Sequence, residues 1–179
     1  MLQPRWYSGF VVTCFLAVSW GGCVSKPTMH LNHAEISGAT LSTFPPGVGI
    51  LMTVVVDVYN PNSYDVAIRA MRGQVAMGNN HMVPVDFRAP GKGVWLASER
   101  TTSVRVPVSI PLDLGLMLLR ESAATPLILY RLTGRADVTA SSTFKVESDD
   151  YAVDEQGTIS RQQIAAIIPN SLGALGSPR

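Results

Sequence analysis

The sequence predicts an all-β fold: two packed sheets of about seven short strands, with one short helix inserted. Apolar residues alternate with others in several runs, most clearly at 50–59 and 101–110, as in strands that bury one face. Gly, Pro and Asn clusters separate these runs, and one segment, 111–124, has helical periodicity instead. The 179 residues, of which 46% are hydrophobic, suffice for one domain core.

The first 22 residues resemble an export signal. Arg5 gives them a positive start, and the apolar run 10–18 is too short to span a bilayer as a permanent helix. Two glycines and then Cys23 follow, which resembles a bacterial lipobox, although Trp20 stands where Leu is usual. We therefore expect cleavage before Cys23 and lipidation of its thiol. An ordinary signal peptide or an uncleaved anchor is the alternative.

Cysteine usage favours lipidation. Cys14 lies inside the signal, so the exported chain keeps Cys23 alone and forms no internal disulfide. Val24 follows where inner-membrane retention commonly uses Asp, so we expect an outer-membrane location facing the periplasm in a Gram-negative host. Residues 23–33 are expected to form a tether and residues 34–42 a first strand.

The strongest strand prediction covers residues 50–59. Its alternate residues should face the core: Ile50, Met52, Val54, Val56 and Val58. The turn Asn60-Pro61-Asn62 ends the strand, because Pro fixes φ and Asn side chains bond nearby backbone groups. We interpret this turn as structural rather than as a recognition feature. A strand follows at 64–77, with Gly73 as a bulge or bend.

Two prolines predict edge strands. A short strand at 82–87 contains Pro84, and the strand at 101–110 contains Pro107; proline lacks the N–H that a central strand must donate. In the strand at 101–110, one set of alternate residues should face inward: Thr102, Val104, Val106, Val108 and Ile110.

The one substantial helix that we expect lies within 111–124 and stops before Pro126. Alternation returns at 127–138, where Gly134 interrupts the inward set of Ile128, Tyr130, Leu132, Ala136 and Val138.

The end of the chain gives weaker patterns. A last pair of strands is expected at 144–146 and 152–153, and the domain should close near residue 160. Residues 161–179 are expected to be a C-terminal tail, with a short helix before Pro169.

Four pieces of the chain occur in an order that resembles the LEA type 2 family, also called the WHy domain (water stress and hypersensitive response). The pieces are Val58-Tyr59-Asn60-Pro61-Asn62, Val104–Ile110, the Leu-rich helix and Leu129-Tyr130-Arg131-Leu132-Thr133-Gly134. The resemblance covers residues 34–160, and the acidic stretch 147–150 departs from the family's compact final strand. The resemblance implies an immunoglobulin-like or fibronectin III-like β-sandwich of about seven strands, an association with tolerance of desiccation and other stresses, no catalytic residues and no cofactor.

The residues themselves predict no enzyme. His30, His33 and His81 are too few for a structural zinc site, which needs four His or Cys ligands, so no metal is expected. No Gly-x-Ser-x-Gly elbow is present, and we infer no small-molecule substrate. The formal net charge of +1 makes nucleic acid an improbable partner.

Some apolar residues fall on nominally outer strand faces: Leu51, Val55, Leu127 and Leu129. The helix, the tail or a partner must cover them, and we expect the helix to do so. If Leu127 and Leu129 stay uncovered, they form a candidate contact surface.

Two functions remain open. The first is a lipid-anchored, non-catalytic module of the cell envelope that binds broadly or protects stress-damaged client proteins. The second is a structural subunit that docks onto an envelope complex through an edge strand or an apolar patch.

Overall fold

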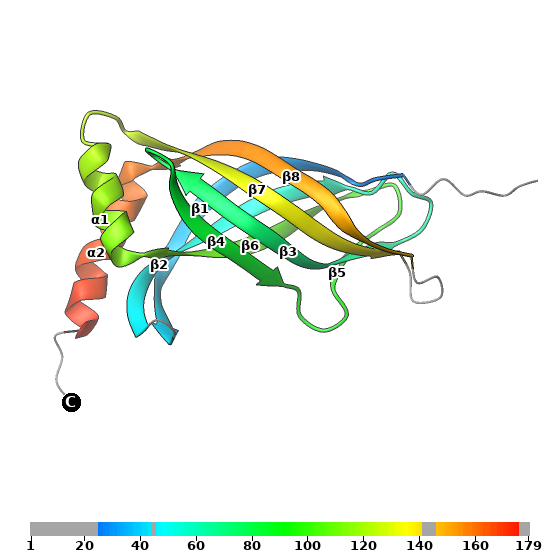
Figure 1. Cartoon of the computed structure of the whole chain (residues 1–179), viewed down its shortest axis with the longest axis horizontal. Helices are drawn as coiled ribbons and strands as arrows, with labels where there is room; N and C mark the ends of the chain where they lie inside the picture. Colours follow the sequence, from blue (N-terminus) through cyan, green and yellow to red (C-terminus); the bar gives the residue numbers. More distant parts are fainter. Residues whose placement is uncertain (1–24, 44–45, 141–145, 176–179) are drawn as a thin grey trace, which may run out of the picture.

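The computed structural model describes residues 25–43, 46–140 and 146–175. These residues form eight strands and two helices, and the strands pair in two antiparallel sheets (Figure 1). The strands are β1 (Thr28–Thr43), β2 (Pro46–Tyr59), β3 (Val66–Met77), β4 (His81–Arg88), β5 (Val94–Leu96), β6 (Thr101–Pro111), β7 (Leu127–Ala140) and β8 (Val146–Ser160). The helices are α1 (Leu112–Glu121) and α2 (Arg161–Leu175). The all-β sandwich is confirmed, with one strand more than predicted and a C-terminal helix that is longer than expected.

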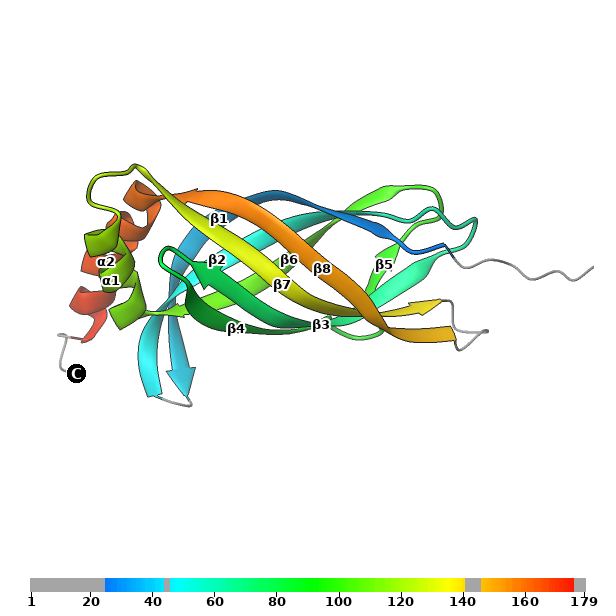
Figure 2. The ribbon, with the colours of Figure 1, turned by 45° about the horizontal axis from the view of Figure 1, so that its top comes forward.

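One sheet has the strand order β1-β2-β6 and the other β4-β3-β7-β8, with β5 paired to the start of β3. Between the sheets, β1 lies beside β8 and β4 beside β6 (Figure 2). Pro84 is on β4 and Pro107 on β6, and both strands are at a sheet edge. The edge positions predicted from the two prolines are therefore correct.

The space between the sheets holds the core. All five predicted core residues of 50–59 are fully buried, and so are Val104, Val106, Val108 and Ile110 of β6. From β7, all five predicted inward residues are buried as well. Period-2 alternation was sufficient for these strands because each buries one face against the other sheet.

β3 departs from the prediction at two places. Strict alternation from Val66 and Ile68 would place Ala70 in the core, but the pairing with β7 shifts register between Ile68 and Ala70, and Met71 is buried instead. Gly73 is not a bulge. It lies directly opposite Gly134 in continuous pairing, and a Cβ on Gly134 would sit 2.5 Å from the carbonyl oxygen of Arg72. The two glycines let β3 and β7 approach closely at this point.

β1 starts at Thr28, within the predicted tether 23–33. Its apolar side chains are half-buried against the core: Met29, Leu31, Ala34 and Ile36. Register shifts at Leu31/His33 and Ile36/Gly38 break the alternation of this strand. A half-buried edge strand with two irregularities has no clear period in its sequence, and the tether prediction failed for that reason.

The chain after β7 also differs from expectation. One long strand, β8, replaces the predicted short pair, with a register shift where Ala136 and Val138 meet it; Phe144 and Lys145 lie outside the described residues. α2 continues through Pro169 and buries Ile164 and Ile168. The segment expected to be a tail is in part a packed helix.

The two helices lie together at one end of the sandwich (Figure 1). A Cβ on Gly115 of α1 would be 2.5 Å from Cδ1 of Ile50, so the helix packs tightly on the start of β2. At the opposite end are the start of β1, the end of β2 and the strand β5 (Figure 1). No described helix is long and apolar enough to cross a bilayer.

Candidate functional site

The Asn60-Pro61-Asn62 turn forms a buried polar network at the end of β2. Asn60 is 0% exposed and Asn62 is 5% exposed. The amide nitrogen of Asn60 donates to the carbonyl oxygens of Tyr64, Leu96 and Ala97 at 2.8, 3.1 and 3.3 Å. Its Oδ1 accepts from the backbone N–H and the Nδ2 of Asn62 at 3.1 and 3.0 Å. This network satisfies backbone groups of the turn itself and of the end of β5, which supports the structural interpretation of the turn.

The same network holds the first described residue. The backbone N–H of Ser25 donates to Oδ1 of Asn62, and Nδ2 of Asn62 donates back to the Ser25 carbonyl, both at 2.9 Å. Lys26 then lies 5.9 Å from the ring centroid of Tyr151, and Pro27 is buried. The chain is therefore fixed to the domain from Ser25 onward. Cys23 lies outside the described residues.

Leu127 and Leu129 are not covered by α1. They are 52% and 71% exposed, so the expectation of cover by the helix was wrong for this pair. The helix sits over the start of β2 instead, where it contacts Ile50. The other two apolar residues differ: Val55 is 3% exposed between its cross-strand neighbours His33 and Arg105, and Leu51 is half-buried.

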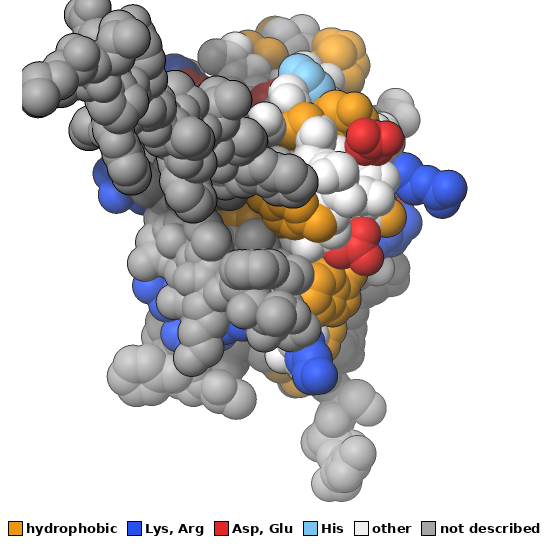
Figure 3. Space-filling view, turned by 90° about the vertical axis from the view of Figure 1, so that its right-hand side faces the viewer, with side chains coloured by type: hydrophobic (Ala, Val, Ile, Leu, Met, Phe, Trp, Pro, Cys, Tyr) orange, Lys and Arg blue, Asp and Glu red, His pale blue; other side chains and the backbone are white. Residues whose placement is uncertain are grey.

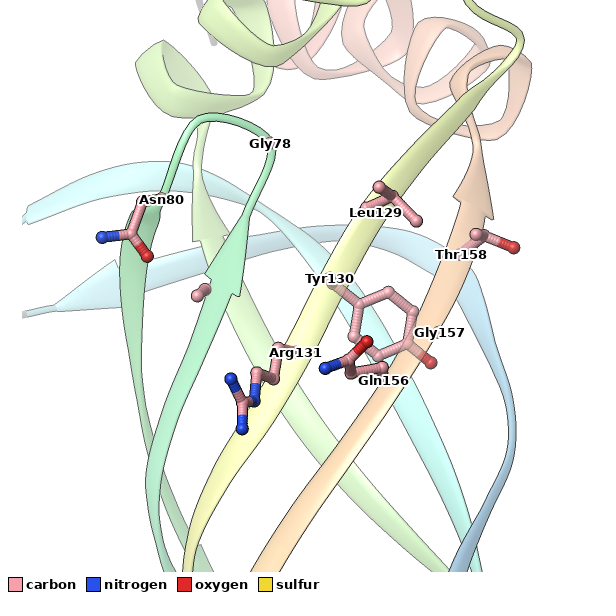
Figure 4. Close-up of a pocket in the computed structure, with 9 residues that line it drawn as sticks. Gly78, Asn80, Leu129, Tyr130, Arg131, Gln156, Gly157 and Thr158 are labelled. Atoms are coloured by element: carbon pink, nitrogen blue, oxygen red, sulfur yellow. The ribbon is translucent and has the colours of Figure 1, made fainter.

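Leu129 stands beside a shallow hollow of about 490 Å³ on the outer face of the larger sheet (Figure 4). Strands β3, β7 and β8 and the turn after β3 line it: Ala76, Gly78, Asn80, Leu129, Tyr130, Arg131, Gln156, Gly157 and Thr158. The turn is held by Gly78, whose φ of 53° favours glycine and whose N–H donates to the Leu129 carbonyl at 3.0 Å.

A second hollow, of about 230 Å³, continues toward α1. It shares Gly78 and Leu129 with the first and adds Leu127, Leu118 and Glu121. The two hollows form one open surface that joins the end of α1 to β7. We call this surface, with Leu127 and Leu129 at its centre, the leucine groove.

Beneath the groove, the ring of Tyr130 lies over Gly157 of the neighbouring strand (Figure 4). A Cβ on Gly157 would be 2.6 Å from the Tyr130 hydroxyl, so only glycine leaves room for the ring. The buried hydroxyl has no hydrogen-bond partner among the described residues. Burial raises the pKa of Tyr130 to about 12, because the phenolate is poorly solvated there.

The densest polar cluster outside the turn surrounds Asp57 on the smaller sheet. Ser103 Oγ donates to its carboxylate at 2.6 Å and Asn32 Nδ2 at 2.7 Å, and these bonds, with the nearby His33, lower the pKa of Asp57. His33 Nδ1 lies 2.9 Å from Oδ1 of Asn32, so the imidazole is directed to this amide. Activation of a serine needs a base on its hydroxyl. Ser103 bonds a carboxylate that is a weakened base, so this geometry favours a cross-strand polar contact over a nucleophile.

No group of three or more His, Cys, Asp and Glu residues in the described part of the chain could hold a metal ion. The histidines are scattered. His30 and His33 are on β1, and His81 Nε2 lies 2.9 Å from Oε1 of Glu121, which joins the start of β4 to the end of α1.

The arrangement of the strands is similar to that of solved proteins. The solution structure of AT1g01470 from Arabidopsis thaliana has a TM-score of 0.54 and 18% identity, over 76% of this chain and 83% of that one. The two chains share a fold. The solution structure of At2g46140.1, provisionally described as a late embryogenesis abundant (LEA) protein, has a TM-score of 0.46 and 17% identity, over 78% of this chain and 73% of that one. A crystal structure of a protein from Archaeoglobus fulgidus has a TM-score of 0.43 and 7% identity, over 76% and 95%.

The inference of a shared fold rests on the first of these structures. No model of a known protein family matches this sequence, and a search of curated proteins gives no match either.

Sequence reasoning named both leucines and the Asn turn but missed what surrounds them. The Gly78-Asn79-Asn80 turn carried a signal, since Gly and Asn adopt positive φ readily. The bond between Ser25 and Asn62 joins residues 37 positions apart and had no local signal.

Proposed function

We propose that this chain is a lipid-anchored, non-catalytic protein of the cell envelope, which protects stress-damaged proteins by transient contact of their apolar segments with the leucine groove. The observation that carries the proposal is the exposure of Leu127 and Leu129, at 52% and 71%, in an open hollow that no described element covers. The resemblance of the sequence to the LEA type 2 family supports the protective role. The signal-like start and Cys23 support the anchor.

The shape and composition of the surface around the leucine groove favour broad, weak binding. Further exposed aliphatic side chains lie at the end of the sandwich that holds α1 and α2, which we call the helix end: Met82, Leu116 and Met117. Unbranched Met and open hollows adapt to many partners, as in other promiscuous binders. A specific small ligand would need a more enclosed pocket with convergent polar groups.

Aggregation of a heat-sensitive client protein, followed by light scattering, tests the proposal. The wild-type chain is expected to lower the scattering relative to an equal mass of a non-interacting protein. The double variant Leu127→Ser/Leu129→Ser is expected to lose most of this protection. Leu41→Ser is the matched control, because Leu41 is 79% exposed but lines neither hollow. Equal protection by all three chains would overturn the role of the groove.

Docking onto an envelope complex is the second candidate, and the uncovered apolar surface favours it too. In that case one protein would co-purify with the solubilised lipoprotein at a fixed ratio, and Leu127→Ser/Leu129→Ser would abolish the ratio. The wild-type chain alone would then give no protection to unrelated clients.

A further inference from the structure

The exposed large hydrophobic side chains of the described residues separate by type along the molecule. Six are aliphatic and lie at the helix end, on or beside the leucine groove and the β1–β2 hairpin: Leu41, Met82, Leu116, Met117, Leu127 and Leu129. The two aromatic ones, Tyr59 and Trp95, lie at the opposite end, at the end of β2 and in β5.

The aromatic end is also where the chain enters the domain. Ser25 is bonded there to Asn62 in both directions, and Thr28 already begins β1. Cys23 is two residues before Ser25. Two extended residues reach at most about 7 Å, so a lipid on Cys23 could not be far from this end.

We infer that the lipid bilayer itself is the partner of this end: Trp95 and Tyr59 lie in the membrane interface, and the sandwich stands on the membrane with its helices farthest away. The inference rests on the proposed lipid anchor. Trp and Tyr are the residues that favour the interface, because their rings are apolar while the N–H and O–H remain solvated. Figure 3 looks directly at this end, where hydrophobic side chains alternate with acidic and basic ones.

Charge does not drive this contact. In the described loops and first residues of the aromatic end, Lys26, Lys92 and Arg100 nearly balance Asp65 and Glu99. The lipid and the rings must therefore supply the attraction, and vesicles of zwitterionic phosphatidylcholine are the appropriate probe.

Trp95 makes the inference measurable. The chain has tryptophan at positions 6, 20 and 95, and the first two lie in the signal, so the processed lipoprotein contains Trp95 alone. In vesicles of phosphatidylcholine brominated near the headgroup end of the acyl chains, we expect strong quenching of its fluorescence relative to unbrominated vesicles. The matched control is Trp95→Phe/Leu129→Trp, whose single tryptophan stands in the leucine groove at the other end and should be quenched several-fold less.

A second variant tests whether the short connection between Cys23 and Ser25 orients the domain on the membrane. Twelve Gly and Ser residues inserted between Val24 and Ser25 keep the anchor but remove the constraint on the domain, and quenching of Trp95 should fall toward the level of the control. Unquenched Trp95, equal quenching of the two tryptophans, or undiminished quenching after the insertion would each overturn the inference. Mass spectrometry of the same samples reads out the lipid on Cys23, so a missing anchor is distinguished from a wrong orientation.

Discussion

At the scale of single residues, the polar groups of the interior differ sharply in how well they are satisfied. Asn60 and Asn62 make all their bonds inside the protein, whereas the Tyr130 hydroxyl makes none among the described residues. A satisfied buried amide stabilises a fold, and an unsatisfied hydroxyl costs free energy. Removing the two kinds of polar group should therefore change the stability of the fold in opposite directions.

Asn60→Ala should destabilise the domain by roughly 1–3 kcal/mol or more, because the carbonyls of Tyr64 and Leu96 would lose their donor. Thermal unfolding followed by circular dichroism measures the change. Ser63→Ala, an exposed neighbour in the same turn, should leave the melting temperature nearly unchanged. Similar melting temperatures for both variants would contradict the role of the network.

Tyr130→Phe should keep or raise stability at neutral pH, since the hydroxyl has no partner to lose. The pKa of Tyr130 is raised from 10.0 to about 12 in the folded chain. Below pH 10 the ionisation of Tyr130 therefore leaves the free energy of unfolding unchanged. As the pH rises toward 12, this free energy falls, because only the unfolded chain ionises freely in that interval. Melting temperatures measured across this interval should fall less steeply in the variant than in the wild type. An identical slope would show that Tyr130 does not titrate as inferred.

Gly134 belongs to the sequence motif that resembles the LEA type 2 family, and its environment gives the residue a physical role. Gly134→Ala would place a Cβ 2.5 Å from the Arg72 carbonyl oxygen, and the two strands would have to move apart. Overpacking of this kind costs roughly 1–3 kcal/mol. Chemical denaturation should show the loss, whereas the same change at the open position Gly47, with nothing within 4 Å, should be mild.

At the scale of elements, the accuracy of sequence reasoning followed the depth of burial. β2 and β6 bury one face along most of their length, so their alternation predicted the core residues correctly except Thr102, which is half-buried. β1 is half-buried with two register shifts, and its first residues were assigned to a tether. The start of the strand depends on a bond from Ser25 to a distant asparagine, which periodicity cannot reveal.

The two central leucines of the groove show the same limit. Their outward direction followed from alternation along β7, but their exposure depends on where α1 packs. The helix position is set by contact with Ile50 and Ile164, and neither contact can be read from a local pattern. The candidate residues could therefore be predicted from the sequence, whereas the surface that they form could not.

The contribution of α2 to the core was the hardest feature to predict from the sequence. Ile164 is 0% exposed and lies within reach of Gly115 in α1. Ile164→Ala should cost about 2–5 kcal/mol as a large-to-small change in the core, while Gln163→Ala, on the exposed side of the same helix, should cost little. Equal denaturation midpoints would mean that the helix does not share the core.

At the scale of the whole molecule, one continuous core extends from the aromatic end to the helix end. We therefore expect both ends to unfold together. With Trp6 and Trp20 replaced by Phe, fluorescence reports on Trp95 at one end, and with the further changes Trp95→Phe/Leu129→Trp it reports on the other. The two thermal transitions should coincide. Separate midpoints would indicate two independently unfolding parts.

The length of the strands sets the distance between the two ends of the sandwich. β7 has 14 residues, and a strand rises about 3.3 Å per residue, so the sandwich can hold its two ends up to about 45 Å apart. A protein that stands on a bilayer on its aromatic end would carry the leucine groove at that height, above the headgroups and clear of lipid. Diffusion in the plane of the membrane would then move the groove through a thin layer parallel to the surface. Encounter with a damaged protein would become a two-dimensional search, in which surface density rather than bulk concentration sets the rate.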